Sequence, residues 1–111
     1  MAKILIVDDE ESIVRSLSTL VRELGHAPLI ASTGEAGIDL FRRERPDAVI
    51  MDVRLPGMNG LESIRRIREI DAAATIIVIT AHGTLDTAVD ATRLGVSDYL
   101  TKPFDVADAE R

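Results

Sequence analysis

Residues 48–60 read AVIMDVRLPGMNG, a short apolar run followed by an aspartate and a loop rich in turn residues. The run from Ala48 to Met51 does not alternate between polar and apolar side chains, which is typical of a strand covered on both faces. Asp52 follows the run, and Pro56 with Gly57 favours a turn shortly after it. The stretch therefore predicts a buried strand that carries a carboxylate at its end.

Four other apolar runs are similarly short. Ile4 to Val7 and Ile76 to Ile79 are also rich in β-branched residues and predict interior strands. Two weaker runs, Ala27 to Ala31 with Pro28 inside it and Ser97 to Leu100, suit the edges of a sheet. Proline favours an edge because it cannot donate to a hydrogen-bond ladder on both sides. Together with residues 48–51, these runs predict five strands.

The segments between the strands carry apolar residues at helical spacing, and each stripe predicts a helix with one buried face. Gly25 and Gly95 are expected to cap the first and fourth helices. Ser32 followed by Glu35 resembles a capping box that opens the second helix, and Pro103 favours the start of a fifth. The stripes are Ile13, Leu17, Leu20, Val21 and Leu24; Ile38 and Phe41; Leu61, Ile64, Ile67 and Ile70; and Leu85, Ala88, Val89 and Thr92.

This alternation of strands and helices predicts an α/β fold, a doubly wound five-stranded parallel sheet with helices on both faces. The flavodoxin-like strand order 2-1-3-4-5 satisfies the burial pattern, because it places the second and fifth strands at the edges. Ligands of such sheets bind beyond the carboxyl ends of the strands, where the order reverses between the first and third strands. Asp8, Asp9 and Asp52 are expected at that place.

Size and composition limit the classes of function. The 111 residues form one domain, residues 1–111, and the last predicted helix is cut off after a few residues, so we expect an effector domain beyond Arg111. The net charge of -6 argues against direct nucleic-acid binding by this domain, because phosphate backbones are held by clustered lysine and arginine. The absence of cysteine excludes disulfides and thiolate metal sites.

The apolar runs are too short for a signal peptide or a membrane span, so no membrane partner is expected and a cytoplasmic location is predicted. His26 and His82 are too isolated in the sequence to suggest a histidine metal site. Both are expected at the surface.

Four predicted strands end in residues that suit a phosphoryl group: Asp8 with Asp9, then Asp52, Thr80 and Lys102. Taken singly, the first pair also fits a helix N-cap, the threonine a strand residue and the lysine a solvated side chain. Their coincidence at one edge favours a shared site. Crowded carboxylates require a cation, and Mg²⁺ is expected because it prefers hard oxygen ligands and shares its shell with phosphates. An aspartate can also accept a phosphoryl group.

At these positions the chain resembles response regulator receiver domains of two-component signalling systems, over nearly its whole length. The run from Thr80 to Leu85 and the proline-glycine loop look like the NtrC-type, sigma-54-dependent activator group. The motifs that carry the resemblance are Val7-Asp8-Asp9-Glu10, the run from Met51 to Gly60, Thr80-Ala81-His82 and Lys102-Pro103-Phe104.

The resemblance implies a role for each of the acidic residues. Asp52 would accept a phosphoryl group from a phosphohistidine of a sensor histidine kinase. Asp9 and Asp52 would bind Mg²⁺ directly, together with the backbone carbonyl of Arg54, and Asp8 would act largely through water. The domain would be a phosphoacceptor that assists its own phosphorylation and dephosphorylation and is not a turnover enzyme.

The resemblance also implies a switch. Lys102 would bind the phosphate, the Thr80 hydroxyl would move toward it, and the Tyr99 ring would turn inward; the alternative for Tyr99 is an edge-strand side chain with a hydrated hydroxyl. A cis peptide is implied before Pro103. The effector would be the protein's own downstream part. In NtrC-type proteins this part consists of an ATPase and a DNA-binding domain that regulate transcription. Formation of a homodimer is left open.

Three other functions remain open at this point. An aspartyl-phosphate phosphohydrolase would need a second aspartate two residues after the nucleophile, where Arg54 stands. A flavin-binding module would need a phosphate-cradling loop after the first strand, and aromatic residues make up only 3% of the chain. A receiver that only docks without phosphorylation is the third alternative.

Overall fold

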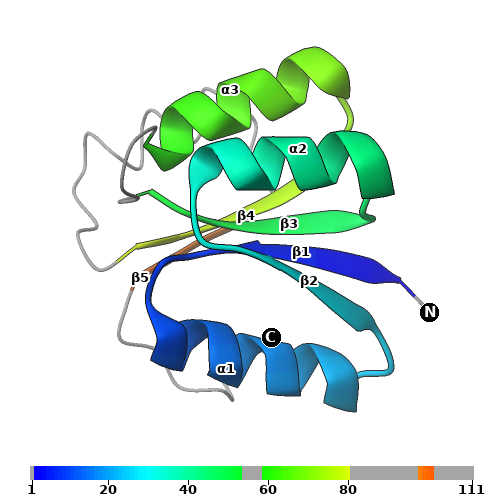
Figure 1. The fold of residues 1–111 in the computed structure, drawn as a ribbon, viewed down its shortest axis with the longest axis vertical. Helices are drawn as coiled ribbons and strands as arrows, with labels where there is room; N and C mark the ends of the chain where they lie inside the picture. The colour runs from blue at the N-terminus through cyan, green and yellow to red at the C-terminus, as the bar shows by residue number, and fades with distance from the viewer. Residues whose placement is uncertain (1, 54–58, 81–97, 102–111) are drawn as a thin grey trace.

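The computed structural model of the chain describes residues 2–53, 59–80 and 98–101. A five-stranded parallel sheet with the strand order β2-β1-β3-β4-β5 forms its centre (Figure 1). This order agrees with the predicted flavodoxin-like arrangement, including the edge positions of β2 and β5. The strands are β1 (Lys3–Val7), β2 (Ala27–Ala31), β3 (Ala48–Asp52), β4 (Thr75–Thr80) and β5 (Asp98–Thr101).

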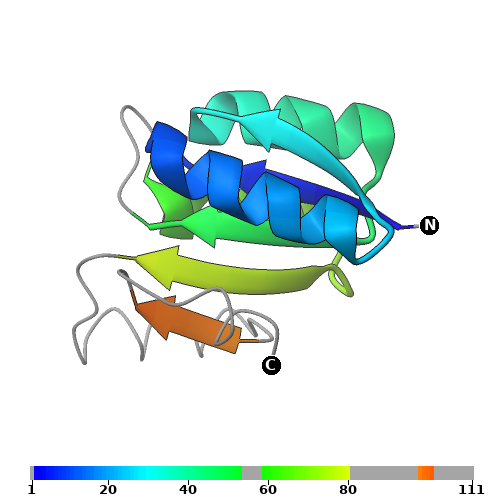
Figure 2. The same cartoon turned by 90° about the horizontal axis from the view of Figure 1, so that it is seen from below.

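Helices cover both faces of the sheet. The helices α2 (Gly34–Glu44) and α3 (Gly60–Ile70) lie side by side on one face, and α1 (Glu11–Glu23) lies on the other (Figure 1). In the second view the arrowheads of β3, β4 and β5, coloured green, yellow-green and orange, point to the same edge (Figure 2). The predicted fourth and fifth helices, with Gly95 and Pro103, fall outside the described residues.

Alternate residues of the interior strands build two separate cores, because successive side chains of a strand point to opposite faces. Leu5, Val7, Val49 and Met51 face α2 and α3 and pack with the buried Phe41. Ile6 and Ile79 face α1 instead, where they pack with Leu17 and Val21. Continuous apolar runs therefore arise because both faces are covered, as predicted for the interior strands.

The end of α1 confirms the predicted role of Gly25. This glycine has a φ of 85°, and its N–H donates to the carbonyl of Arg22, while the N–H of His26 donates to the carbonyl of Val21. These two bonds form a Schellman motif, in which glycine is favoured because a positive φ is strained for residues that carry a Cβ.

The start of α2 differs from the prediction. Its N-cap is Thr33, whose side chain accepts a 3.1 Å hydrogen bond from the N–H of Ala36. The predicted cap, Ser32, lies one residue earlier, so its pairing with Glu35 in a capping box was wrong. A Ser-Thr pair offers two hydroxyls of similar capping strength, so the local sequence does not distinguish between them.

Two other expectations about α1 and the turn after it were also wrong. Leu24, predicted on the buried face, is 57% exposed because it lies beyond the last helical residue. His26, predicted at the surface, is half-buried, and its Nδ1 accepts a 3.0 Å hydrogen bond from the N–H of Ala2. None of the helices in the described ranges is both long and apolar enough to cross a membrane.

Candidate functional site

The pairing of β1 with β3 brings two aspartates to the same edge of the sheet. Val7 lies opposite Met51 in the parallel register, and the next residues along the two strands are Asp8 and Asp52. Both aspartates are buried, with 2% and 3% of their surface exposed, whereas the neighbouring Asp9 is exposed. One carboxylate oxygen from each of the three lies within 4.8 Å of the others.

The turn after β1 holds Asp8 in place from both sides. Its N–H donates to the carbonyl of Ala31 in β2 at 3.1 Å, and its Oδ1 accepts a 2.8 Å hydrogen bond from the N–H of Glu10. Glu10 is the N-cap of α1 and makes no side-chain capping bond. Asp8 and Asp9 therefore precede the N-cap of α1, and the alternative that they are themselves the N-cap is wrong.

Asp52 ends β3 next to the beginning of α3. It lies opposite Ile79 of β4. The N–H of the next residue, Val53, donates to the carbonyl of Ile79 at 3.3 Å. The carbonyl of Val53 in turn accepts a 2.8 Å hydrogen bond from the N–H of Gly60, the first residue of α3. Backbone bonds to two different elements thus fix the chain directly after Asp52.

The helix α3 is itself anchored at its first turn. The Asn59 side chain accepts a 2.9 Å hydrogen bond from the N–H of Glu62, and the Ser63 hydroxyl donates to the carbonyl of Asn59 at 3.0 Å. Asparagine is a favoured N-cap because its side-chain oxygen satisfies a helical N–H that lacks a backbone partner.

The register of the last two strands places two further expected residues, Thr80 and Tyr99. Thr80 ends β4, one residue beyond the partner of Asp52, and lies opposite Thr101, the last residue of β5. Tyr99 of β5 lies opposite Val78 of β4. Lys102 follows Thr101 in the sequence but is outside the described residues, as are Arg54, His82 and the peptide bond before Pro103. The structure thus brings together the three aspartates and the backbone of Thr80.

The aspartate cluster has the chemistry of a site for a hard divalent cation. Three carboxylates supply oxygen ligands, and two of them are buried. The electrostatic attraction between a buried carboxylate and a cation is stronger than the same attraction in water. Asp9 is exposed, so the cluster reaches the surface of the described part of the chain on that side. The arrangement therefore fits a hard divalent cation.

Two residues of this region received no role from the sequence: Asn59 and Gly60. Both were counted among the turn residues of the loop after Asp52, whereas the structure makes one the cap and the other the first residue of α3. An available signal was the position of Asn59 immediately before the apolar stripe of α3, which is typical of a helix start.

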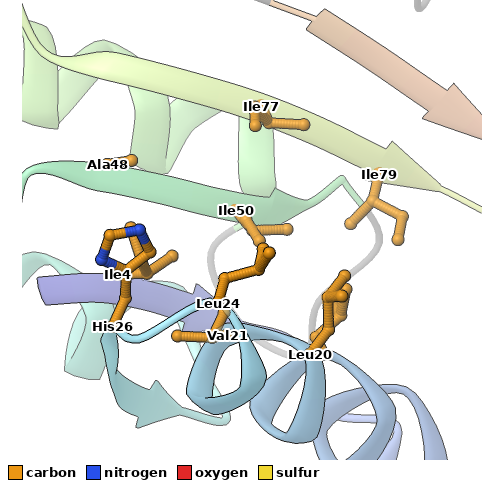
Figure 3. A pocket seen from close by; sticks show the side chains of 10 residues that line it. Ile4, Leu20, Val21, Leu24, His26, Ala48, Ile50, Ile77 and Ile79 are labelled. Atoms are coloured by element: carbon orange, nitrogen blue, oxygen red, sulfur yellow. The ribbon is translucent and has the colours of Figure 1, made fainter. Parts of the chain in front are cut away.

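A hollow on the α1 face differs chemically from the carboxylate cluster. Figure 3 shows its lining of aliphatic side chains from β3, β4 and α1, with His26 at one end. None of the three aspartates lines it. It therefore belongs to the apolar packing of the α1 face and not to the carboxylate site.

Comparisons with known proteins agree with this geometry. The response regulator receiver domain family matches residues 4–110. The chain is 38% identical over 104 residues to sporulation initiation phosphotransferase F of Bacillus subtilis, covering 94% of this chain and 84% of that protein. It is 40% identical over 107 residues to the DNA-binding transcriptional regulator NtrC of Klebsiella pneumoniae, covering 94% of this chain but 22% of that protein.

A solved structure is similar over the same length. The receiver domain of a sensor histidine kinase from Pseudomonas aeruginosa, with a magnesium ion coordinated in its active site cleft, superposes with a TM-score of 0.88 and 30% identity. The match covers 99% of this chain and 92% of that chain. The chain spans less than half the length of several of the curated relatives that it matches.

Proposed function

The chain belongs to the response regulator receiver domain family, and from this membership we propose that it is a phosphorylation-driven signalling switch. Asp52 accepts a phosphoryl group from a sensor histidine kinase, with Mg²⁺, and the change in conformation is passed to an effector. The observation that supports this most is the cluster of Asp8, Asp9 and Asp52, whose carboxylate oxygens lie within 4.8 Å of one another at the reversal point of the strand order.

In the proposed transfer, a carboxylate oxygen of Asp52 forms a bond to phosphorus as the bond between phosphorus and the kinase histidine nitrogen breaks. The electron pair of the broken bond returns to the imidazole, and the product is an acyl phosphate on Asp52.

The residues present fit a magnesium ion. Asp9 and Asp52 would hold it directly, together with the Arg54 backbone carbonyl, and Asp8 would act largely through water. When bound, the ion would neutralise the charge that develops on the phosphoryl oxygens. Asp8 in addition fixes the turn that presents Asp9, through its hydrogen bond with the N–H of Glu10.

Thr80 and Lys102 act on the phosphorylated form. The Lys102 ammonium would pair with the phosphoryl group, and the Thr80 hydroxyl would donate to one of its oxygens. The strand positions support this proposal, because β4 ends at Thr80 and Lys102 follows the last residue of β5. The Tyr99 ring would then turn inward and change the surface around β5.

The proposed partners are a sensor histidine kinase and the protein's own effector. The similarity to NtrC supports an effector of the sigma-54-dependent activator type, with an ATPase and a DNA-binding domain. Binding of DNA would then belong to that effector, and a change in dimerisation is one way to carry the signal. The phosphoacceptor role is regulatory, and the domain would act in the cytoplasm, where the kinase presents its phosphohistidine.

The test is phosphorylation by a small donor. The chain is incubated with acetyl phosphate and Mg²⁺, and its intact mass is compared with that of an Asp52→Asn variant. We expect the mass of one phosphoryl group to be added only when both Mg²⁺ and Asp52 are present. Equal labelling of the Asp52→Asn variant would contradict the acceptor assignment, and a lack of labelling under conditions that label another receiver would favour phosphorylation-independent docking.

The same preparation distinguishes the two remaining alternatives. Sustained hydrolysis of phosphate esters by the chain would favour a phosphohydrolase despite Arg54 at the position of its general acid. Absorbance in the visible range that copurifies with the protein would favour a flavin-binding module.

A further inference from the structure

The start of α3 packs directly against the backbone of the proposed phosphoacceptor. A Cβ built on Gly60 would lie 2.0 Å from the carbonyl oxygen of Asp52 and 2.7 Å from the Cα of Val53. Both distances are far below van der Waals contact, and both atoms belong to the backbone. No side-chain rotation can therefore relieve the clash that any residue larger than glycine would create.

The need for glycine here is one of space and not of backbone freedom. Among the described glycines, Gly25 is the one with a positive φ, whereas Gly60 has the conformation of a first helical residue. Its N–H donates to the Val53 carbonyl, so Gly60 is hydrogen-bonded to the residue after Asp52 and also packs against the Asp52 carbonyl.

The contact is held from the helix side as well. The Asn59 cap and the Ser63 hydroxyl fix the first turn of α3, and Ile64 and Ile67 anchor the helix with 0% of their surface exposed. A displacement at Gly60 is therefore transmitted to Asp52, because the helix cannot move away without exposing its buried face.

We propose that Gly60 is a positioning residue of the metal site. By allowing α3 to rest on the Asp52 carbonyl, it fixes where the Asp52 carboxylate stands relative to Asp8 and Asp9. The inference rests on the proposed function in so far as the cluster binds Mg²⁺. Residues that orient metal ligands typically change metal affinity by about 10- to 100-fold when they are replaced.

The test is the Mg²⁺ affinity of a Gly60→Ala variant of the full chain, measured by calorimetric titration. We expect the dissociation constant to rise by about tenfold or more. The matched control is Gly25→Ala, which strains a residue with a φ of 85° in open space at the far end of α1. That variant is expected to have a lower free energy of unfolding, measured in urea, and the same Mg²⁺ affinity as the unchanged chain.

A second variant serves if Gly60→Ala does not fold. Asn59→Ala removes the cap of α3 without adding an atom near Asp52, and a smaller rise in the dissociation constant is expected. Unchanged Mg²⁺ affinity in the folded Gly60→Ala variant, or in Asn59→Ala where the first does not fold, overturns the inference.

The titration also separates this inference from the proposed function. Mg²⁺ binding by the unchanged chain without labelling by acetyl phosphate would remove the proposed function and leave the role of Gly60 intact. An unchanged chain that does not bind Mg²⁺ would overturn the inference, because there would be no metal site to position.

Discussion

Val7 and Met51 lie opposite one another in the parallel pairing of β1 with β3, and each is followed by a buried aspartate. A shift of this register by one residue would turn every side chain of a strand to the opposite face of the sheet. The apolar residues on both faces therefore fix the position of the acidic site, because the cores that they form exist in only one register.

The metal site predicts a specific effect of Asp9. In an Asp9→Asn variant, the increase in melting temperature on addition of Mg²⁺ should be much smaller than in the unchanged chain, because one charged ligand is lost and bound ligand stabilises the folded state. The measurement is a thermal unfolding series in Mg²⁺. Glu10→Gln is the control, since Glu10 is also exposed and acidic but is not part of the cluster; equal effects of both variants would contradict the assignment.

The proposed role of Lys102 predicts a loss of output and not of metal binding. Lys102→Ala should keep most of the Mg²⁺ affinity but lose the chemical-shift changes that phosphorylation causes at Thr80 and Tyr99, measured by NMR. The control is Lys3→Ala, which removes the chain's other lysine, an exposed one that pairs with Glu44 at 3.4 Å. Normal phosphorylation-induced shifts in the Lys102→Ala variant would count against its role.

The core on the α2 and α3 face predicts a large stability difference between two aliphatic residues. Ile64→Ala should lower the free energy of unfolding by about 2–5 kcal/mol, because Ile64 is fully buried and its removal leaves a cavity. Leu24→Ala should change it by only about 0.5 kcal/mol, since Leu24 is 57% exposed. Urea unfolding measures both, and similar losses would mean that Leu24 is buried as its sequence pattern indicated.

The helix cap of α2 predicts a difference between adjacent hydroxyl residues. Thr33→Ala should lower the free energy of unfolding by about 1 kcal/mol, because the N–H of Ala36 loses its acceptor. Ser32→Ala should have little effect, since Ser32 is exposed and precedes the cap. Urea unfolding of the two variants decides between them, and the reverse ranking would restore the capping box predicted from the sequence.

Most elements of the described fold could be predicted because their signals are local. The strand Ala27–Ala31 was predicted with its observed bounds, and the stripe of α3 identified Ile64 and Ile67 as buried. The errors occurred where local signals were equivalent. Ser32 and Thr33 have similar capping ability, and Leu24 continues an apolar stripe by one residue beyond the helix that carries it.

The sequence by itself determined the alternation of strands and helices, which faces of them are apolar, and that Asp8, Asp9 and Asp52 follow strands. These properties depend on residue type and spacing along the chain. Only the tertiary structure decided that the three carboxylates share a site and that Gly60 must lack a side chain. Both depend on how distant segments pack against one another, and the pairing of β1 with β3 and the docking of α3 on the Asp52 carbonyl are set by the two cores as a whole.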